Sequence, residues 1–140
     1  VTIDAELGDK ASGVLYALGG SGGGLALYMD KGHLVYEYNM MIIERFVARS
    51  PGPIPAGRRR IEVSTVLDGP KPLSPAQVVL KVDGAEVART TVKRTVPAAF
   101  SASETFDVGV DLGSTVSLDD YARRPFRFDG AISSVKVDLR

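Results

Sequence analysis

Acidic side chains late in the chain have the types and spacing that could hold a metal ion. Asp107, Asp111 and Asp120 lie around two glycines, at positions 109 and 113, which let a backbone turn between successive ligands. Carboxylate oxygens on a loop are what Ca²⁺ prefers, although this spacing is not that of an EF-hand. One hypothesis is therefore a calcium site at these three residues. The alternative is a loop neutralised by the arginines that follow it, which are Arg123, Arg124 and Arg127.

Hydrolytic chemistry would need either two facing carboxyl groups or an activated nucleophile. Glu37 and Glu44 are candidates for the carboxyl pair of a glycoside hydrolase, but acidic residues at outward strand positions are usually solvated. A nucleophile has little support, because His33 is the single histidine and Gly-x-Ser-x-Gly occurs only within the glycine-rich stretch Gly19 to Gly24, which is expected to be a hairpin loop. The chain also has no cysteine, which excludes a disulfide framework, a Cys-ligated zinc site and a thiol nucleophile.

Aromatic residues with an arginine among them form a candidate binding face. Tyr28, Tyr36, Tyr38 and Phe46 fall on neighbouring predicted strands, with Arg45 beside them. Such a face could stack on sugar rings or on a partner protein. Sugar-binding platforms usually rely on tryptophan, however, and the chain has none. Packing in a core or an interface is therefore the alternative for these five residues.

Composition argues against several kinds of partner. The chain has 17 basic and 17 acidic residues, whereas a nucleic-acid-binding protein should show a basic excess. The run Arg58-Arg59-Arg60 is too short for such a patch and is expected to begin a strand. The stretch from Gly19 to Gly24 lacks the Lys-Ser/Thr pair and the helix of a phosphate loop, so we expect a hairpin loop. No stretch approaches the ~18 apolar residues of a membrane span. We therefore expect neither a nucleic-acid nor a membrane partner.

Strands must position these candidates, because the dominant hydrophobic period of the chain is two. Alternation over 34–39, 78–82 and 135–139 places one set of side chains on a buried face. Residues 25–29 and 33–38 read as a hairpin joined by Asp30-Lys31-Gly32. Residues 78–82 and 85–92 read as another, in which Asp83-Gly84 supplies the positive-φ positions of a type I′ turn.

Two other segments complete the secondary-structure prediction. Met40 to Val47 is expected to be a strand because of its β-branched pair, and Ser117 to Tyr121 is expected to form a short helical turn. Many short strands punctuated by Gly and Pro turns predict an all-β protein, an antiparallel β-sandwich or barrel. We expect a single domain over residues 1–140. Because Val1 opens within a strand pattern, we expect the chain to be a piece of a longer protein.

The most specific string lies in the last third of the chain. It runs Glu104-Thr105-Phe106-Asp107-Val108-Gly109, then Asp111-Leu112-Gly113-Ser114-Thr115-Val116-Ser117, and closes with Pro125-Phe126-Arg127-Phe128-Asp129-Gly130-Ala131-Ile132. Earlier, Gly23-Gly24-Leu25-Ala26-Leu27-Tyr28 and Leu34-Val35-Tyr36-Glu37-Tyr38-Asn39 agree with the same pattern. Over nearly its whole length the chain resembles the C-terminal region of bacterial arylsulfatases. Met40-Met41-Ile42-Ile43 and Pro70 to Pro75 depart from that family pattern.

This resemblance implies a fold and a function. The fold would be a jelly-roll β-sandwich of the concanavalin A-like (lectin and glucanase) or laminin-G-like kind. Sulfatases act through a formylglycine made from a Cys/Ser-x-Pro-x-Arg motif and through a divalent metal, and this chain has no such motif. It would then be a non-catalytic accessory domain, without a catalytic residue or cofactor of its own, that packs on a bacterial sulfatase catalytic domain or forms a homo-oligomer. A module that binds carbohydrate or sulfated glycan is the alternative, and both periplasmic and cytoplasmic locations stay open.

Overall fold

The computed structural model describes residues 1–20, 22–40, 42, 44–71, 73–95, 106–112, 115–117 and 122–138. Its described part is built from β-strands, and no helix in it is long and apolar enough to cross a membrane. The strands are β1 (Thr2–Leu7), β2 (Gly13–Gly20), β3 (Gly23–Asp30), β4 (His33–Met40), β5 (Glu44–Arg49), β6 (Gly57–Leu67), β7 (Ala76–Val82), β8 (Ala85–Val92), β9 (Phe106–Val108) and β10 (Ala131–Lys136).

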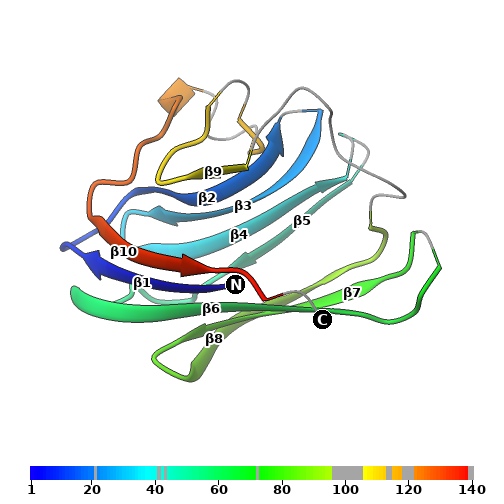
Figure 1. Cartoon of the computed structure of the whole chain (residues 1–140), viewed down its shortest axis with the longest axis horizontal. Coiled ribbons are helices and arrows are strands. Elements are labelled where there is room, and N and C mark those ends of the chain that lie inside the picture. The colour runs from blue at the N-terminus through cyan, green and yellow to red at the C-terminus, as the bar shows by residue number, and fades with distance from the viewer. Residues whose placement is uncertain are drawn as a thin grey trace.

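The strands form two antiparallel sheets that stack face to face. Sheet A has the order β10-β1-β6-β7-β8, and sheet B has the order β5-β4-β3-β2-β9. Figure 1 shows them as two layers, with sheet B above sheet A and the N-terminus at the start of β1 in the lower layer. The predicted all-β antiparallel sandwich is therefore confirmed.

Alternation within each strand builds the core between the sheets. On β4, Leu34, Tyr36 and Tyr38 face sheet A and are buried in this core. The fully buried side chains that sheet A contributes include Ile3 and Ile61. Apolar burial of this kind stabilises a sandwich by about 25 cal/mol for each Å² removed from water. The alternate residues of β4 point to the outer face of sheet B, where the candidate site lies.

The turns follow the local sequence chemistry. Asp83 and Gly84 have φ values of 51° and 86°, as a type I′ turn requires, and they join β7 to β8. Lys31 and Gly32 likewise have φ values of 48° and 88° between β3 and β4. Both predicted hairpins are therefore confirmed. The glycine stretch 19–24 forms a tighter connection than expected, because Gly19, Gly20, Gly23 and Gly24 belong to the paired strands β2 and β3.

The expectation of a continuous strand over Met40 to Val47 is wrong. β4 ends at Met40 and β5 begins at Glu44, so the segment contains a turn. The physical reason is the side chain of Asn39, whose Oδ1 accepts a hydrogen bond of 2.8 Å from the backbone N–H of Ile42. Ile42 has a φ of 68°, and its side chain is exposed. A local side-chain bond of this type competes with extended structure.

Candidate functional site

The candidate site is the outer face of sheet B and the segment that covers it. We call this segment the strap, and its described residues are 106–112, 115–117 and 122–128. The strap includes β9, which pairs with β2 at the edge of the sheet. Its other end is tied to β2 by a backbone hydrogen bond of 2.8 Å from Val14 N–H to the carbonyl of Phe126.

A recess of small residues receives the strap. Ala17 and Ala26 are directly paired neighbours on β2 and β3, and Val116 of the strap packs in a cluster with both. Gly24 extends this recess, because a Cβ there would lie 2.8 Å from Cγ2 of Val116 and 2.3 Å from the carbonyl oxygen of Leu18. Val116 is fully buried. Small side chains on a strand commonly mark the close approach of another backbone.

Polar side chains hold the strap in place and shape it. The Nδ2 of Asn39 donates to the carbonyl of Val116 at 3.2 Å, and Asp111 Oδ2 accepts from Val116 N–H at 3.0 Å. Asp107 Oδ2 accepts from Leu112 N–H at 2.9 Å. Of the buried polar residues in the described chain, all but Ser50 lie on the strap or on the strand face beneath it, namely Glu37, Asn39, Asp107, Asp111, Thr115 and Ser117.

A buried ion pair lies under the middle of the strap. Arg45 Nη2 is 2.5 Å from Glu37 Oε1, and the side chain of Glu37 is only 1% exposed whereas that of Arg45 is 32% exposed. The hydroxyl of Ser117 also donates to Glu37 Oε1, at 3.3 Å. A carboxylate this deeply buried requires a cation or hydrogen-bond donors to offset its lost hydration. The geometry therefore gives Glu37 a structural role at the strap interface.

A second charged cluster lies where β3 ends. Asp30 receives hydrogen bonds of 3.0 Å from both Arg49 and Arg123. Burial of Asp30 opposes its ionisation, but these hydrogen bonds outweigh burial and hold the pKa of Asp30 below its usual value. The guanidinium of Arg123 also lies 4.1 Å from the centre of the Phe126 ring, and Phe126 meets Tyr28 edge to face. Arg123 thus links the strap to β3 through Asp30, which Arg49 of β5 also binds.

The five residues of the predicted aromatic face lie on two sides of sheet B. Tyr36, Tyr38 and Phe46 point into the core between the sheets, with exposed fractions of 1%, 6% and 8%. Tyr28 and Arg45 lie on the outer face, where Tyr28 is buried under Phe126 of the strap. The five therefore do not share one exposed surface. The register between β3 and β4 separates Tyr28 from Tyr36, because Tyr28 pairs with Val35 and not with Tyr36.

Two of the predicted calcium ligands are in the strap. Asp107 and Asp111 are both buried and accept backbone hydrogen bonds within it, whereas Asp120 lies outside the described residues, as do residues 118–121 of the expected helical turn. Among the described residues, no three His, Cys, Asp or Glu side chains converge as a metal site would require. Calcium binding at Asp107, Asp111 and Asp120 stays a prediction.

The other candidates for catalysis lie apart. Glu37 is on the outer face of sheet B, whereas Glu44 pairs in register with Met40 of the inner face and is 3.3 Å from Arg94. The two carboxylates thus point to opposite sides of the sheet. His33 is half-buried, and its Nδ1 lies 2.9 Å from the carbonyl oxygen of Ser50.

Sheet A carries a hollow of about 330 Å³ on the face that points away from sheet B. A bulge in β10 creates it, because Asp4 pairs with Ser134 and Ala5 with Ile132, which leaves Ser133 unmatched. Arg60 binds Asp4 through two hydrogen bonds, of 2.9 and 3.2 Å. Arg58 also lines the hollow, its side chain is 89% exposed, and it lies 3.7 Å from Glu6.

A larger groove of about 430 Å³ lies between the segment 50–55 and the β7–β8 turn. Apolar residues such as Pro51, Pro53 and Val87 line it together with the charged residues Asp83 and Glu86. Arg59 bridges the two sides of the groove, since it donates 3.0 Å hydrogen bonds to the carbonyl of Pro55 and to Asp83. The sequence singled out the arginine run, but nothing in its spacing indicated that Arg59 would close a groove.

Val116 and Asn39 matter to the site, yet sequence reasoning missed both. The available signal was the set of small residues at outward strand positions, Ala17, Gly24 and Ala26, which predicts a close neighbour. The segment that packs on these small residues is the strap, which has no hydrophobic periodicity. The sequence therefore gave no signal that Val116 would fill the recess.

The fold is similar to that of a solved structure described as the mouse laminin alpha1 chain, domains LG4-5. The two match with a TM-score of 0.67 and 16% sequence identity over 94% of this chain and 33% of that one. This chain therefore spans about a third of that structure. No protein-family model and no curated protein matches the sequence. The likeness shows a laminin-G-like β-sandwich, and no comparison connects the chain to an arylsulfatase.

Proposed function

We propose that this chain is a non-catalytic accessory domain that packs on a larger catalytic domain, as the arylsulfatase resemblance implies. The observation that carries the proposal is the structural role of the residues in the string that resembles arylsulfatases. Asp107, Asp111 and Ser117 all make hydrogen bonds that shape the strap or attach it to sheet B. Residues that stabilise a β-sandwich are what a scaffold domain needs. The fold alone would not distinguish this role from others.

Gly130 lies near the end of the same string, and the packing around it leaves no room for a side chain. A Cβ at Gly130 would lie 2.2 Å from the carbonyl oxygen of Glu6 and 2.6 Å from the ring of Phe128. The close approach lets β10 begin beside β1. Gly130 therefore supports the same fold-bearing role as Asp107, Asp111 and Ser117.

The experiment that tests this proposal is a comparison of two chains from the same gene. The reading frame ahead of Val1 should encode a Cys/Ser-x-Pro-x-Arg motif, and the longer chain should hydrolyse an aryl sulfate such as p-nitrophenyl sulfate. The chain of residues 1–140 alone should not hydrolyse it. A reading frame without the motif, or sulfatase activity in residues 1–140 alone, would overturn the proposal.

A second candidate is a module that binds sulfated glycans, and the hollow on sheet A favours it. Arg58 and the hydroxyl-bearing Ser133 both line this hollow. An exposed guanidinium beside a hydroxyl is suited to a sulfate group, because guanidinium donors match oxyanions in geometry and charge. Glu6, which lies 3.7 Å from Arg58, would have to yield its place to such a ligand.

Calorimetry with a sulfated glycan and its desulfated form tests the second candidate. Binding of the sulfated form alone, lost in Arg58→Ala, would support it. Lys81→Ala is the matched control, because Lys81 lies on the same sheet but does not line the hollow. Equal heats for the two glycans, or binding that survives Arg58→Ala, would remove the candidate.

A further inference from the structure

The groove between the segment 50–55 and the β7–β8 turn combines buried apolar residues with carboxylates. Ile54 and Val82 are buried within it, and Val87 is half-buried beside them. Asp83 of the turn and Glu86 of β8 line the same groove. Figure 1 shows the β7–β8 turn at the end of sheet A where β6 begins. A hollow of about 430 Å³ that offers apolar contacts and a few polar groups is typical of a binding site.

Hydrogen bonds hold both sides of the groove in place. On one side, the backbone N–H of Ile54 donates to the carbonyl of Gly32 at 2.7 Å. Arg59 connects the two sides, because it donates 3.0 Å hydrogen bonds to the carbonyl of Pro55 and to Asp83. The groove is therefore formed before a ligand arrives, and binding requires little additional ordering of the chain.

Hydrogen-bond acceptors outnumber donors among the residues that line the groove. The three prolines of the segment 50–55 have no backbone N–H. Ser50 and Arg59 carry the side-chain donors of the lining, and both are already bonded within the protein, Ser50 to the carbonyl of Gly52 at 2.8 Å. The lining also has two carboxylates, Asp83 and Glu86, against the single guanidinium of Arg59. Its charge therefore favours a cation.

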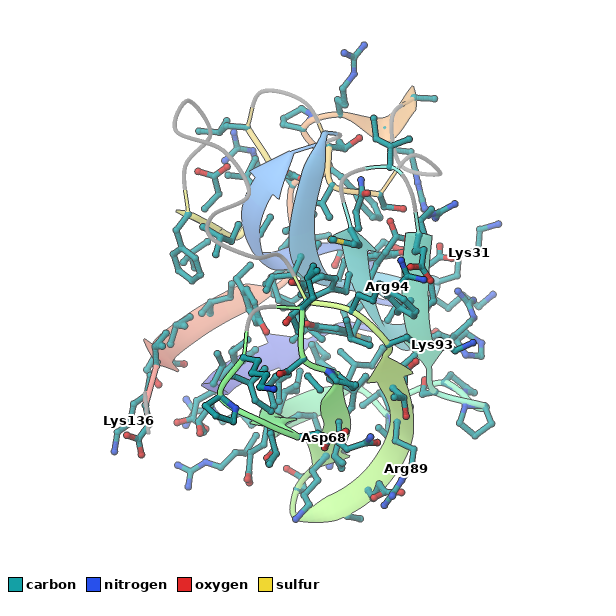
Figure 2. The ribbon with its side chains drawn as sticks, turned by 90° about the vertical axis from the view of Figure 1, so that its right-hand side faces the viewer. Lys31, Asp68, Arg89, Lys93, Arg94 and Lys136 are labelled. Carbon is teal, nitrogen blue, oxygen red and sulfur yellow. The ribbon has the colours of Figure 1, made fainter. Side chains whose placement is uncertain are left out.

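Both carboxylates are ionised and retain acceptor capacity. Asp83 accepts from the backbone N–H of Arg60 at 2.9 Å and from Arg59 at 3.0 Å, and these bonds hold its pKa below the usual value. Glu86 accepts hydrogen bonds from Arg89, which likewise lower its pKa. Arg89, which Figure 2 labels, is 66% exposed and does not line the groove. Because each carboxylate oxygen can accept two hydrogen bonds, both groups can bind a further donor.

We propose that this groove is a docking site for an arginine side chain of the partner domain. The aliphatic stem of the arginine packs on Ile54, Val82 and Val87, and its guanidinium binds the carboxylates of Asp83 and Glu86. This inference rests on the accessory-domain proposal for the identity of the partner, whereas the chemistry of the groove is independent of it.

Charge and exposure favour this occupant over the alternatives. An anion in the groove would lie beside two carboxylates of like charge, and complementary charge is what selects a partner. A guanidinium carries five N–H donors in a planar fork, which matches a lining rich in acceptors. A free guanidinium compound would contact only the groove. A polypeptide segment would also cover the exposed faces of Pro51, Pro53 and Pro55 along one side.

Nuclear magnetic resonance titration of the 140-residue chain tests the site. The probe is a capped Ala-Ala-Arg-Ala-Ala peptide, and the same peptide with citrulline in place of arginine is the uncharged control. The arginine peptide should shift the amide signals of Asp83, Gly84, Glu86 and Val87 and bind about fivefold more tightly than the citrulline peptide. Glu86→Gln should reduce this difference to about twofold or less. Asp68→Asn is the matched control variant and should preserve it, because Asp68, labelled in Figure 2, is exposed at the opposite end of β7.

Each other outcome overturns the proposal. Equal binding of the two peptides, or a difference that survives Glu86→Gln, would show that the carboxylates do not select a cation. Binding of n-propylguanidinium as tight as that of the arginine peptide would assign the groove to a free ligand. Signals of the groove that shift with protein concentration in the absence of peptide would assign it to a second copy. In a longer chain that carries the partner domain, the peptide should no longer shift these signals, and undiminished shifts would exclude that domain. Absence of a sulfatase motif in the longer chain would remove the arylsulfatase function and leave the groove intact.

Discussion

Truncation of Val116 to alanine should reveal how firmly the strap belongs to the folded protein. Val116 is fully buried in a cluster with Ala17 and Ala26, and its backbone groups are bonded to Asp111 and Asn39. Val116→Ala leaves the backbone groups in place and removes only two methyl groups. The substitution therefore measures apolar packing between the strap and sheet B.

The expected loss follows from that burial. Two buried methyl groups contribute about 1.6 kcal/mol of transfer free energy, at about 0.8 kcal/mol each. The space they leave adds up to about 1 kcal/mol more, because Ala17, Ala26 and Gly24 are too small to fill it. We therefore expect Val116→Ala to lower the free energy of unfolding by about 2 kcal/mol.

Urea unfolding followed by far-ultraviolet circular dichroism measures this loss. Val47→Ala is the matched control, since Val47 lies on the same outer face but is 46% exposed. The control should cost less than about 0.5 kcal/mol. If Val116→Ala were as mild as Val47→Ala, the reasoning that the strap is packed as part of the fold would be refuted. A loss of about 2 kcal/mol with an unchanged m-value would support one cooperative unit that includes the strap.

Three further predictions concern the ion pairs, the glycines and the acidic residues. Because Arg123 and Arg49 hold the pKa of Asp30 below its usual value, the stability they supply is present above about pH 4 and is lost as the pH falls through the folded-state pKa. Asp30→Asn should remove this part of the acid sensitivity in pH-dependent thermal melts, and an unchanged acid limb would contradict it. Gly130→Ala should destabilise strongly in urea because its Cβ would overlap the Glu6 carbonyl, whereas Gly52→Ala, with open space around it, should be mild; similar losses would contradict the close approach. If Asp107, Asp111 and Asp120 bind Ca²⁺, the melting temperature should rise with Ca²⁺ and fall with a chelator, and no shift in either direction would count against the site.

Local chemistry was enough to predict the strands and hairpins. The alternation of Leu34, Tyr36 and Tyr38 gave a buried face, and Asp83-Gly84 gave its turn, because both signals arise within a few neighbouring residues. The prediction of a continuous strand from Met40 to Val47 was wrong, and the reason is also local. Asn39 is a residue whose side chain competes with the strand, and its bond to Ile42 turns the chain.

The candidate face could not be predicted, because it depends on contacts between distant segments. Tyr28 and Tyr36 lie on neighbouring strands, and only the register between β3 and β4 shows that they face opposite sides. Asp107 and Asp111 are predicted calcium ligands because they are oxygen donors among glycines, and this prediction is untested. That their carboxylates accept backbone hydrogen bonds within the strap could not be predicted, because a sequence shows the same residue types in both cases.

The distribution of buried polar groups limits where a partner can act. In the described part of the chain these groups concentrate under the strap, where Glu37 is paired with Arg45 and Asn39 with Val116. A ligand on the part of sheet B that the strap covers would have to displace Val116 and expose a carboxylate that is 1% accessible. The hollow beside Arg58 needs no such rearrangement, since the Arg58 side chain is already open to solvent. Binding should therefore change amide exchange on sheet A before it changes exchange beneath the strap.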